Sequence, residues 1–217
     1  MTAPHNKNLN SYKSLYIDQF FKVVNNNTQI PPTHGYNVSE DHYVKVEIYT
    51  DGSCKANGKK HAQSAFAFQI YVNDILEHQH AAAVEGTTTT TTTAATTAAT
   101  TAATTAAKKT NQRAELLAIL EALRFVKKNL SRVICDPNNF VTLYSDSEYS
   151  IKCITEWCKN WDESDWAKKK NTDILRDILA IYSNLNISFK HVRAHTAATD
   201  KHSLRNALVD KLAQSKI

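Results

Sequence analysis

Four acidic residues of this 217-residue chain lie at positions where an ordinary globular domain gains nothing from a carboxylate. Asp51 and Asp146 end runs typical of strands, and Glu115 and Asp210 lie on apolar helical patterns. Carboxylates at strand ends and on the inner faces of helices can converge in space. Converging carboxylates repel one another, and hard divalent cations relieve that repulsion. The four acids therefore predict a site for divalent metal ions.

Each acid also has an ordinary structural explanation, and residue by residue these explanations stay open. Asp51 precedes Gly52, and Asp-Gly is a turn signal. Asp146 could cap the helix expected after it. Glu115 would suit the positive end of a helix dipole, and Asp210 would suit a solvated helix face. Taken together, the four positions favour the metal site.

The elements that must position these acids follow from hydrophobic periodicity and turn residues. We expect three strands first, near 44–51, 64–72 and 75–82, with Asn73-Asp74 as the tight turn between the last two. The expected order continues with a helix near 111–128, a strand near 140–146, helices near 147–158 and 172–184, a strand near 187–193 and a helix near 203–215. Three antiparallel strands followed by alternating helices and strands predict an α/β fold, a mixed sheet covered by helices.

Seven segments, in order, resemble the type 1 ribonuclease H family. They are Tyr-Thr-Asp-Gly-Ser-Cys at 49–54, Thr-Asn-Gln-Arg-Ala-Glu-Leu at 110–116, Tyr-Ser-Asp-Ser-Glu-Tyr at 144–149, Ile-Thr-Glu-Trp at 154–157, Asn-Trp at 160–161, His-Val-Arg-Ala-His at 191–195 and Asn-Ala-Leu-Val-Asp-Lys-Leu-Ala at 206–213. The resemblance covers residues 44–217. It implies the RNase H-like fold, a five-stranded mixed sheet with three antiparallel strands and then parallel strands, flanked by helices.

The resemblance also implies an activity. Such an enzyme is an endonuclease that hydrolyses the RNA strand of RNA:DNA hybrids by two-metal-ion catalysis, leaving 5′-phosphate and 3′-hydroxyl ends. Asp51 would bridge two Mg²⁺ ions, with Glu115 and Asp146 completing one side and Asp210 the other. Mn²⁺ would substitute for Mg²⁺. An all-carboxylate site agrees with magnesium, which prefers oxygen ligands.

His195 is the fifth candidate catalytic residue. It lies in the loop expected after the last strand. An imidazole titrates near neutral pH, so His195 could transfer a proton or assist product release beside an acidic site. A surface role for this histidine stays open.

A second set of residues is expected to bind the substrate. Asn111 and Gln112 precede Glu115 and would meet 2′-hydroxyls and base edges in the wide minor groove of an RNA-containing duplex. Trp157 and Trp161 would face the DNA strand, although both could instead anchor a short helix in the core. The remaining candidates for substrate binding are Ser53, Asn57, Arg113 and Asn206.

Two segments differ from the rest of the chain. Residues 1–43 are polar apart from 12–24, which has the spacing of one short amphipathic helix, and we expect an appended, partly disordered segment. Residues 87–107 consist entirely of Thr and Ala, without charge or aromatic side chains. We expect this tract to be a disordered insertion in the 44–217 domain.

Composition agrees with a nucleic-acid enzyme without requiring one. The formal charge of +5 suits a phosphate-rich partner. The four cysteines show no Cys-x-x-Cys spacing, which favours a reducing compartment. Neither a membrane span nor a secretory signal is apparent. We expect an intracellular, cytoplasmic monomer, or a nuclear one in a eukaryotic or viral context, with no membrane or protein partner.

Three other classes of protein compete with this interpretation. A catalytically silent module on the same fold usually lacks one or more of the acids, whereas here all four are present. Junction resolvases and integrases lack the Asn-Gln-Arg-Ala-Glu segment at 111–115. A reverse-transcriptase fragment is conceivable, although nothing polymerase-like precedes residue 44. One departure from the family weakens expected hybrid affinity: residues 162–165 are acidic where bacterial members are basic, leaving only Lys168 to Lys170 as a cluster.

Overall fold

The computed structural model describes residues 43–85, 88–91, 103–106, 108–194 and 199–217. Several sequence-based predictions lie wholly or largely outside these residues: the appended, partly disordered segment at 1–43 with its helix at 12–24, the disorder of most of the Thr/Ala tract at 87–107, and the role of His195. The described residues from 43 onward belong to one compact unit.

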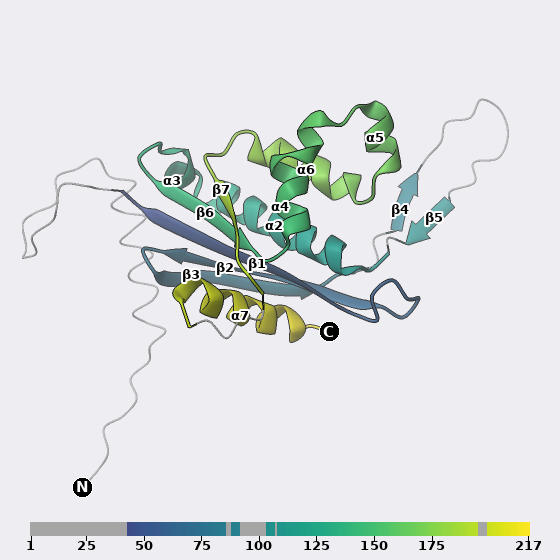
Figure 1. Cartoon of the computed structure of the whole chain (residues 1–217), viewed down its shortest axis with the longest axis horizontal. Helices are drawn as coiled ribbons and strands as arrows, with labels where there is room; N and C mark the ends of the chain where they lie inside the picture. Colours follow the sequence, from purple (N-terminus) through teal and green to yellow (C-terminus); the bar gives the residue numbers. More distant parts are fainter. Residues whose placement is uncertain (1–42, 86–87, 92–102, 107, 195–198) are drawn as a thin grey trace, which may run out of the picture. The chain divides into compact units, whose positions relative to one another are not determined.

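A five-stranded mixed sheet forms the centre of this unit (Figure 1). Its strands are ordered β3-β2-β1-β6-β7, with bounds Lys45–Lys55 for β1, Gln63–Val72 for β2, Ile75–Ala83 for β3, Phe140–Ser145 for β6 and Ser188–His191 for β7. The first three strands pair antiparallel, and β6 and β7 run parallel to β1. This confirms the predicted mixed sheet.

The turn between β2 and β3 forms where the sequence predicts it. Asn73 and Asp74 both have positive φ angles, 47° and 68°. Asn and Asp tolerate this left-handed region because their short polar side chains bond locally, and two such residues make the turn whose twist matches a hairpin.

Helices cover both faces of the sheet. Figure 1 shows α7 on one face and α2, α4 and α6 on the other. Their bounds, with those of the short helices, are Asn111–Asn129 for α2, Ser131–Cys135 for α3, Glu148–Thr155 for α4, Trp157–Asn160 for the 3₁₀ helix η1, Glu163–Lys168 for α5, Thr172–Tyr182 for α6 and Lys201–Gln214 for α7. The helix predicted at 147–158 is therefore two, α4 and η1, with a break at Glu156.

Two short helices, α3 and α5, were not predicted. Neither is longer than six residues, so neither carries enough turns for a helical period to appear in the sequence. The start of α5 does have a local signal, because the carboxylate of Asp162 caps it by accepting a hydrogen bond from the backbone N–H of Asp165 at 2.9 Å.

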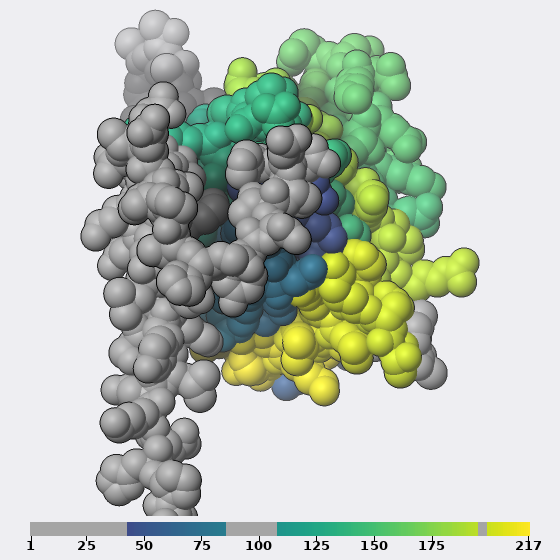
Figure 2. All heavy atoms as spheres, turned by 90° about the vertical axis from the view of Figure 1, so that its left-hand side faces the viewer, coloured from purple at the N-terminus to yellow at the C-terminus, as the bar shows by residue number. Residues whose placement is uncertain are grey.

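Buried side chains on both faces of β1 place this strand at the centre of the core. Val46 and Ile48 are fully buried, as is Tyr49, which packs with Val209 and Ala213 of α7. Figure 2 shows the yellow surface of α7 beside the blue surface of the first strands. The strand that carries Asp51 is thus held between two layers of helices.

The Thr/Ala tract departs from the prediction of disorder over eight of its residues. Thr88–Thr91 and Ala103–Ala106 form β4 and β5, an antiparallel pair separate from the main sheet. The physical reason is that β-branched Thr favours extended backbone, and two such segments can satisfy one another's backbone groups without a hydrophobic core.

None of the helices in the described part of the chain combines the length and apolar character that a bilayer crossing needs. All four cysteines lie among the described residues, and none forms a disulfide.

Candidate active site

Asp51 and Asp146 lie side by side because their strands are parallel neighbours. The last pair in the ladder between β1 and β6 joins Thr50 to Ser145, and the two acids each follow by one residue. β1 continues to Lys55, so Asp51 lies within a strand and not in a turn. Corresponding ends of parallel strands therefore bring two carboxylates to one edge of the β1–β6 ladder.

Glu115 reaches the same place because α2 packs unusually close to β1. A Cβ atom on Gly52 would lie 2.2 Å from the backbone nitrogen of Glu115 and 2.4 Å from the carbonyl carbon of Ala114. Only glycine allows this approach. Since Gly52 follows Asp51 directly, the start of α2 places Glu115 beside Asp51.

Local capping excludes the ordinary explanations for two acids. Thr110 caps α2 by accepting a hydrogen bond from the N–H of Arg113, and Glu115 lies beyond the first turn with 5% exposure. Ser147, and not Asp146, caps α4 through its side chain. Neither Glu115 nor Asp146 is therefore explained by a helix end.

Three carboxylates converge in the site. One ligand oxygen from each of Asp51, Glu115 and Asp146 lies within 4.8 Å of the others. Asp51 Oδ2 and Glu115 Oε2 are buried and have no hydrogen-bond partner. Buried polar atoms normally have partners, so these oxygens call for a ligand that is not part of the chain.

The electrostatics of the site also indicate that the carboxylates need a positively charged partner. Burial, followed by the charges of Asp146 and Asp210, raises the pKa of Asp51 to about 8. Burial and then the charge of Asp51 raise the pKa of Glu115 well above its ordinary value, although a hydrogen bond from the Gly52 backbone lowers it in part. Crowded carboxylates of this kind are stabilised by a proton or by a cation.

The donor set fits a hard divalent cation. All three clustered ligands are carboxylate oxygens, which suit such ions better than soft ones. The two unpartnered buried oxygens are the atoms that a bound cation would satisfy. The site is therefore a candidate divalent-metal centre.

Asp210 of α7 lines the same pocket without joining the tight cluster. The pocket has a volume of about 380 Å³. Gln214 Nε2 donates a hydrogen bond of 2.6 Å to Asp210 Oδ1. The charge of Asp210 nevertheless acts on Asp51 and Glu115, so all four predicted acids share one electrostatic environment.

Among the predicted substrate-binding residues, Ser53 and Asn111 line this pocket with the four acids. Sequence reasoning missed five further lining residues: Gly52, Cys54, Ser147, Ala194 and Gln214. Gln214 had a signal, because it follows Asp210 by four residues on a predicted helix. The others were hidden because a lining position depends on how distant elements meet.

The remaining predicted substrate-binding residues lie outside the pocket lining: Asn57, Gln112, Arg113, Trp157, Trp161 and Asn206. Asn206 does not line the pocket, but its Nδ2 donates a hydrogen bond of 3.2 Å to Oδ2 of Asp146, which does. Asn57 accepts a hydrogen bond from the N–H of Asn111 at 3.2 Å, at the start of α2. The Arg113 guanidinium bonds both carboxylate oxygens of Asp173, at 3.1 and 2.6 Å, and thereby joins α2 to α6.

Both predicted tryptophans pack edge-on against another aromatic ring. Trp157 is 40% exposed, and its ring lies 5.9 Å from that of Tyr149. Trp161 lies 4.9 Å from Trp166 and carries the Lys169 ammonium 5.7 Å from its ring centre. Neither side chain lines the pocket.

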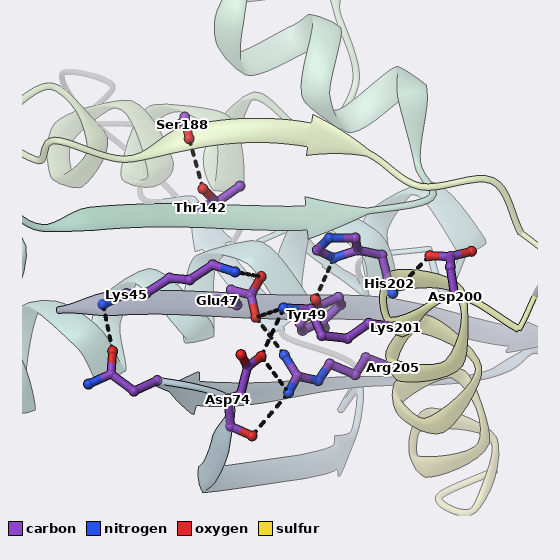
Figure 3. Close-up of polar contacts among 11 residues, drawn as sticks. Lys45, Glu47, Tyr49, Asp74, Thr142, Ser188, Asp200, Lys201, His202 and Arg205 are labelled. Atoms are coloured by element: carbon purple, nitrogen blue, oxygen red, sulfur yellow. Dashed lines mark hydrogen bonds and ion pairs between the residues drawn. The ribbon is translucent and has the colours of Figure 1, made fainter. Parts of the chain in front are cut away.

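A buried ionic network fixes α7, which carries Asp210, against the sheet (Figure 3). Glu47 of β1 is 1% exposed and accepts hydrogen bonds from Arg205 and from Lys201. Burial opposes the ionisation of Glu47, but Lys45 and Lys201 outweigh it and lower its pKa. The Arg205 guanidinium also lies 3.7 Å from the ring centre of Tyr71.

A tyrosine–histidine contact adds to this attachment. The hydroxyl of Tyr49 and Nδ1 of His202 are 2.7 Å apart (Figure 3). The His202 ring also stacks 4.4 Å from that of Tyr144. Together with the ionic network, these contacts hold the first turns of α7 over β1 and β6.

Comparisons with known proteins agree with this geometry. The RNase H family model matches residues 44–217. The chain is 39% identical over 111 residues to a probable ribonuclease H of Acanthamoeba polyphaga mimivirus, an alignment that covers 49% of this chain and 47% of that protein. Identity to the ribonuclease H of Rickettsia massiliae (strain Mtu5) is 30% over 174 residues, covering 78% of this chain and 88% of that one.

Among solved structures, the fold is similar to that of LC11-RNase H1, crystallised in complex with an RNA/DNA hybrid. The TM-score is 0.51 at 18% sequence identity, and the match covers 79% of this chain and 96% of the other. At that identity the likeness concerns the fold alone, and it confirms the predicted fold class.

Proposed function

The chain belongs to the RNase H family, whose model spans residues 44–217, and we propose that it is an endonuclease that hydrolyses the RNA strand of RNA:DNA hybrids. The family predicted from the seven sequence segments is thereby confirmed. One observation carries the proposal to activity: three carboxylates offer oxygens within 4.8 Å of one another, and two buried oxygens among them have no partner.

Asp51, Glu115, Asp146 and Asp210 would hold two Mg²⁺ ions, with Mn²⁺ as a substitute. When bound, two such ions would activate a water and neutralise the leaving oxygen, so that cleavage would leave a 5′-phosphate and a 3′-hydroxyl. The chain's own contribution is placement. Gly52 lets Glu115 approach Asp51, and the amide of Asn206 orients Asp146. This placement is made before substrate binds, so little reorganisation is needed during the reaction.

We assign hybrid recognition to the start of α2. Asn111 lines the pocket, and Gln112 beside it is exposed. Amide side chains both donate and accept hydrogen bonds, which suits 2′-hydroxyls and base edges in the wide minor groove of a hybrid. Arg113 is already engaged by Asp173, so we expect it to support this helix start more than the substrate.

Two aromatic pairs, Trp157 with Tyr149 and Trp161 with Trp166, are candidate contacts for the DNA strand. A flat ring can pack on a sugar or a base without reading sequence. Lys169 lies over Trp161 and would add one positive charge for a phosphate. Two acids follow Trp161 closely in the chain, since Asp162 caps α5 and Asp165 lies in its first turn. These aromatic pairs should therefore attract phosphate only modestly.

His195 is proposed as the proton-transfer residue. The pocket reaches Ala194, the residue directly before it. General acid–base help is worth about 10² to 10⁴-fold, less than a metal ligand supplies. His195→Ala should therefore keep measurable cleavage, which a pH series of single-turnover rates would test.

The deciding experiment compares labelled RNA:DNA hybrid, RNA duplex and DNA duplex, each with Mg²⁺ or Mn²⁺. We expect internal cleavage of the RNA strand of the hybrid alone, and a 5′-phosphate on the downstream product. Asp51→Asn is the matched inactive control. No hybrid cleavage with either metal, or equal cleavage of the RNA duplex, would show that the proposed substrate is wrong.

A further inference from the structure

The last turn of α7 carries an amide that reaches the candidate metal site. Gln214 is the final residue of the helix and follows Asp210 by one helical turn. Its Nε2 donates to Asp210 Oδ1 at 2.6 Å, and both side chains line the pocket.

The helix end that carries Gln214 is itself fastened beside the site. Lys55, the last residue of β1, donates a hydrogen bond of 3.2 Å from Nζ to the main-chain oxygen of Ile217. β1 also carries Asp51, four residues earlier. The chain end that follows Gln214 is therefore bonded to β1, the strand that carries Asp51.

α7 contributes a side-chain amide to each of two acids. Asn206 donates to Asp146 Oδ2, and Gln214 donates to Asp210 Oδ1. Asp146 belongs to the cluster within 4.8 Å, whereas Asp210 does not. The position of Asp210 relative to the cluster therefore depends on whatever fixes its side-chain torsions.

We propose that Gln214 is a positioning residue for the metal site, which fixes the Asp210 carboxylate through Oδ1 and thereby presents Oδ2 to a divalent cation. The inference rests on the proposed function. A carboxylate on a helix can rotate about two torsions, and a donor on one oxygen removes most of that freedom. Partners that orient metal ligands in this way typically change metal affinity or activity by about 10- to 100-fold when removed.

The test is a cation titration of the full chain, read out without catalysis. The melting temperature is measured against Ca²⁺ and Mg²⁺ concentration, since a ligand that binds the folded state raises it. In Gln214→Leu we expect an unchanged melting temperature in EDTA and a half-saturating cation concentration raised by about 10-fold or more. The Mg²⁺ concentration for half-maximal hybrid cleavage should rise in parallel.

Two further variants separate positioning from a general structural effect. Asn184 follows α6, and its amide donates to the main-chain oxygen of Ala180, four residues before it, and to Ser183 Oγ. Asn184→Leu removes these bonds outside the pocket lining and should leave both titrations unchanged. In an Asp210→Asn background, Gln214→Leu should have no further effect on cation binding, because the residue through which it acts is no longer a charged ligand.

Three outcomes would overturn the proposal: an unchanged cation titration in Gln214→Leu, a lower cation requirement, which would mean that the bond competes with the metal, or an equal effect in the Asp210→Asn background. Failure of the proposed function would look different. The parent chain itself would then show neither cation-dependent stabilisation nor hybrid cleavage.

Discussion

At the scale of single residues, the site combines unfavourable burial with unfavourable charge. Asp51 is 4% exposed and Glu115 is 5% exposed, and burial is the largest cause that raises the pKa of each. The charges of Asp146 and Asp210 raise both pKa values further, and the charge of Asp51 also raises that of Glu115. A folded protein retains such a cluster at a cost to its own stability, which is a common property of functional sites. Without metal, the cluster should lower the stability of the fold, whereas a bound cation should stabilise it.

The first prediction concerns Asp146→Asn. Removing one carboxylate relieves repulsion in the cluster, so the metal-free melting temperature should stay the same or rise slightly. The same change removes one metal oxygen, so hybrid cleavage should be lost. Melting curves and cleavage assays on the same preparation check both parts. Cleavage within about tenfold of the parent, equivalent to about 1.4 kcal/mol in the barrier, would contradict the assignment of Asp146.

The second prediction concerns pH in the absence of metal. Asp51 loses its proton near its ordinary pKa of 3.8 in the unfolded chain but only near about 8 in the folded one. Between these values the folded state binds more protons, so stability falls as pH rises. The raised pKa of Glu115 acts in the same direction. In EDTA, the melting temperature should decline from about pH 5 to about pH 8.

Asp51→Asn is the control for that decline, because it cannot ionise and should show a shallower slope. Saturating Mg²⁺ should remove much of the decline in the parent, since the cation favours the ionised carboxylates. A parent whose melting temperature in EDTA is constant or rises over this range would contradict the crowding described for the site.

At the scale of elements, the site depends on how closely α2 and α7 approach β1. The glycine after Asp51 determines the first approach, and the network around Glu47 determines the second. Both are contacts between segments distant in sequence, and each can be tested by one substitution.

The third prediction concerns Gly52→Ala. Its Cβ would lie 2.2 Å and 2.4 Å from backbone atoms of α2, which cannot move as a side chain can. We expect a loss of about 3 kcal/mol or more in the free energy of unfolding, together with loss of cleavage.

Gly58→Ala is the matched control for that substitution. Gly58 has a φ of +75° and nothing within 4 Å of an added Cβ, so only backbone strain of about 1 kcal/mol is expected, with cleavage retained. Urea unfolding of both variants measures the difference. Equal costs at the two positions would show that α2 does not need the close approach.

The fourth prediction concerns Arg205→Met. Removing a guanidinium that is 11% exposed leaves the buried carboxylate of Glu47 with Lys45 and Lys201 alone. Breaking a buried ion pair typically costs about 3 to 5 kcal/mol, and the two lysines should keep the cost near about 3 kcal/mol. The double variant Glu47→Met/Arg205→Met should recover part of this in urea unfolding. A single variant as stable as the parent would show that the network does not hold α7.

At the scale of the whole molecule, the described strands of the Thr/Ala tract form a sheet of their own. The strands β4 and β5 of the Thr/Ala tract pair with one another and not with the five-stranded sheet. The tract carries no charge and no metal ligand. It interrupts the chain between β3 and α2, where a loop tolerates extra length at a small entropic cost.

The fifth prediction follows from that separation. Replacing residues 87–107 with a short Gly-Ser linker should leave the cleavage rate and the Michaelis constant for hybrid nearly unchanged. Steady-state kinetics on parent and variant check this, with salt dependence measured alongside as a sign of phosphate contacts. A large rise in the Michaelis constant would show that the tract contacts the substrate.

The sequence by itself determined the family, the order of the main strands and helices, and the four acids. Strand alternation, the Asn73-Asp74 turn and the apolar face of α2 are local patterns, and local patterns can be read without knowing what lies across the fold. Acids at the ends of predicted strands were visible for the same reason.

Only the tertiary structure decided what each side chain meets. The approach of α2 at Gly52, the bond from Asn206 to Asp146 and the engagement of Arg113 by Asp173 all join residues whose neighbours are set by packing. The last of these lies 60 positions apart in the chain. A periodic pattern specifies which face of an element is buried, but not which atoms of another element lie opposite. For that reason the four acids were predictable, whereas the contacts across the fold that hold them in place were not.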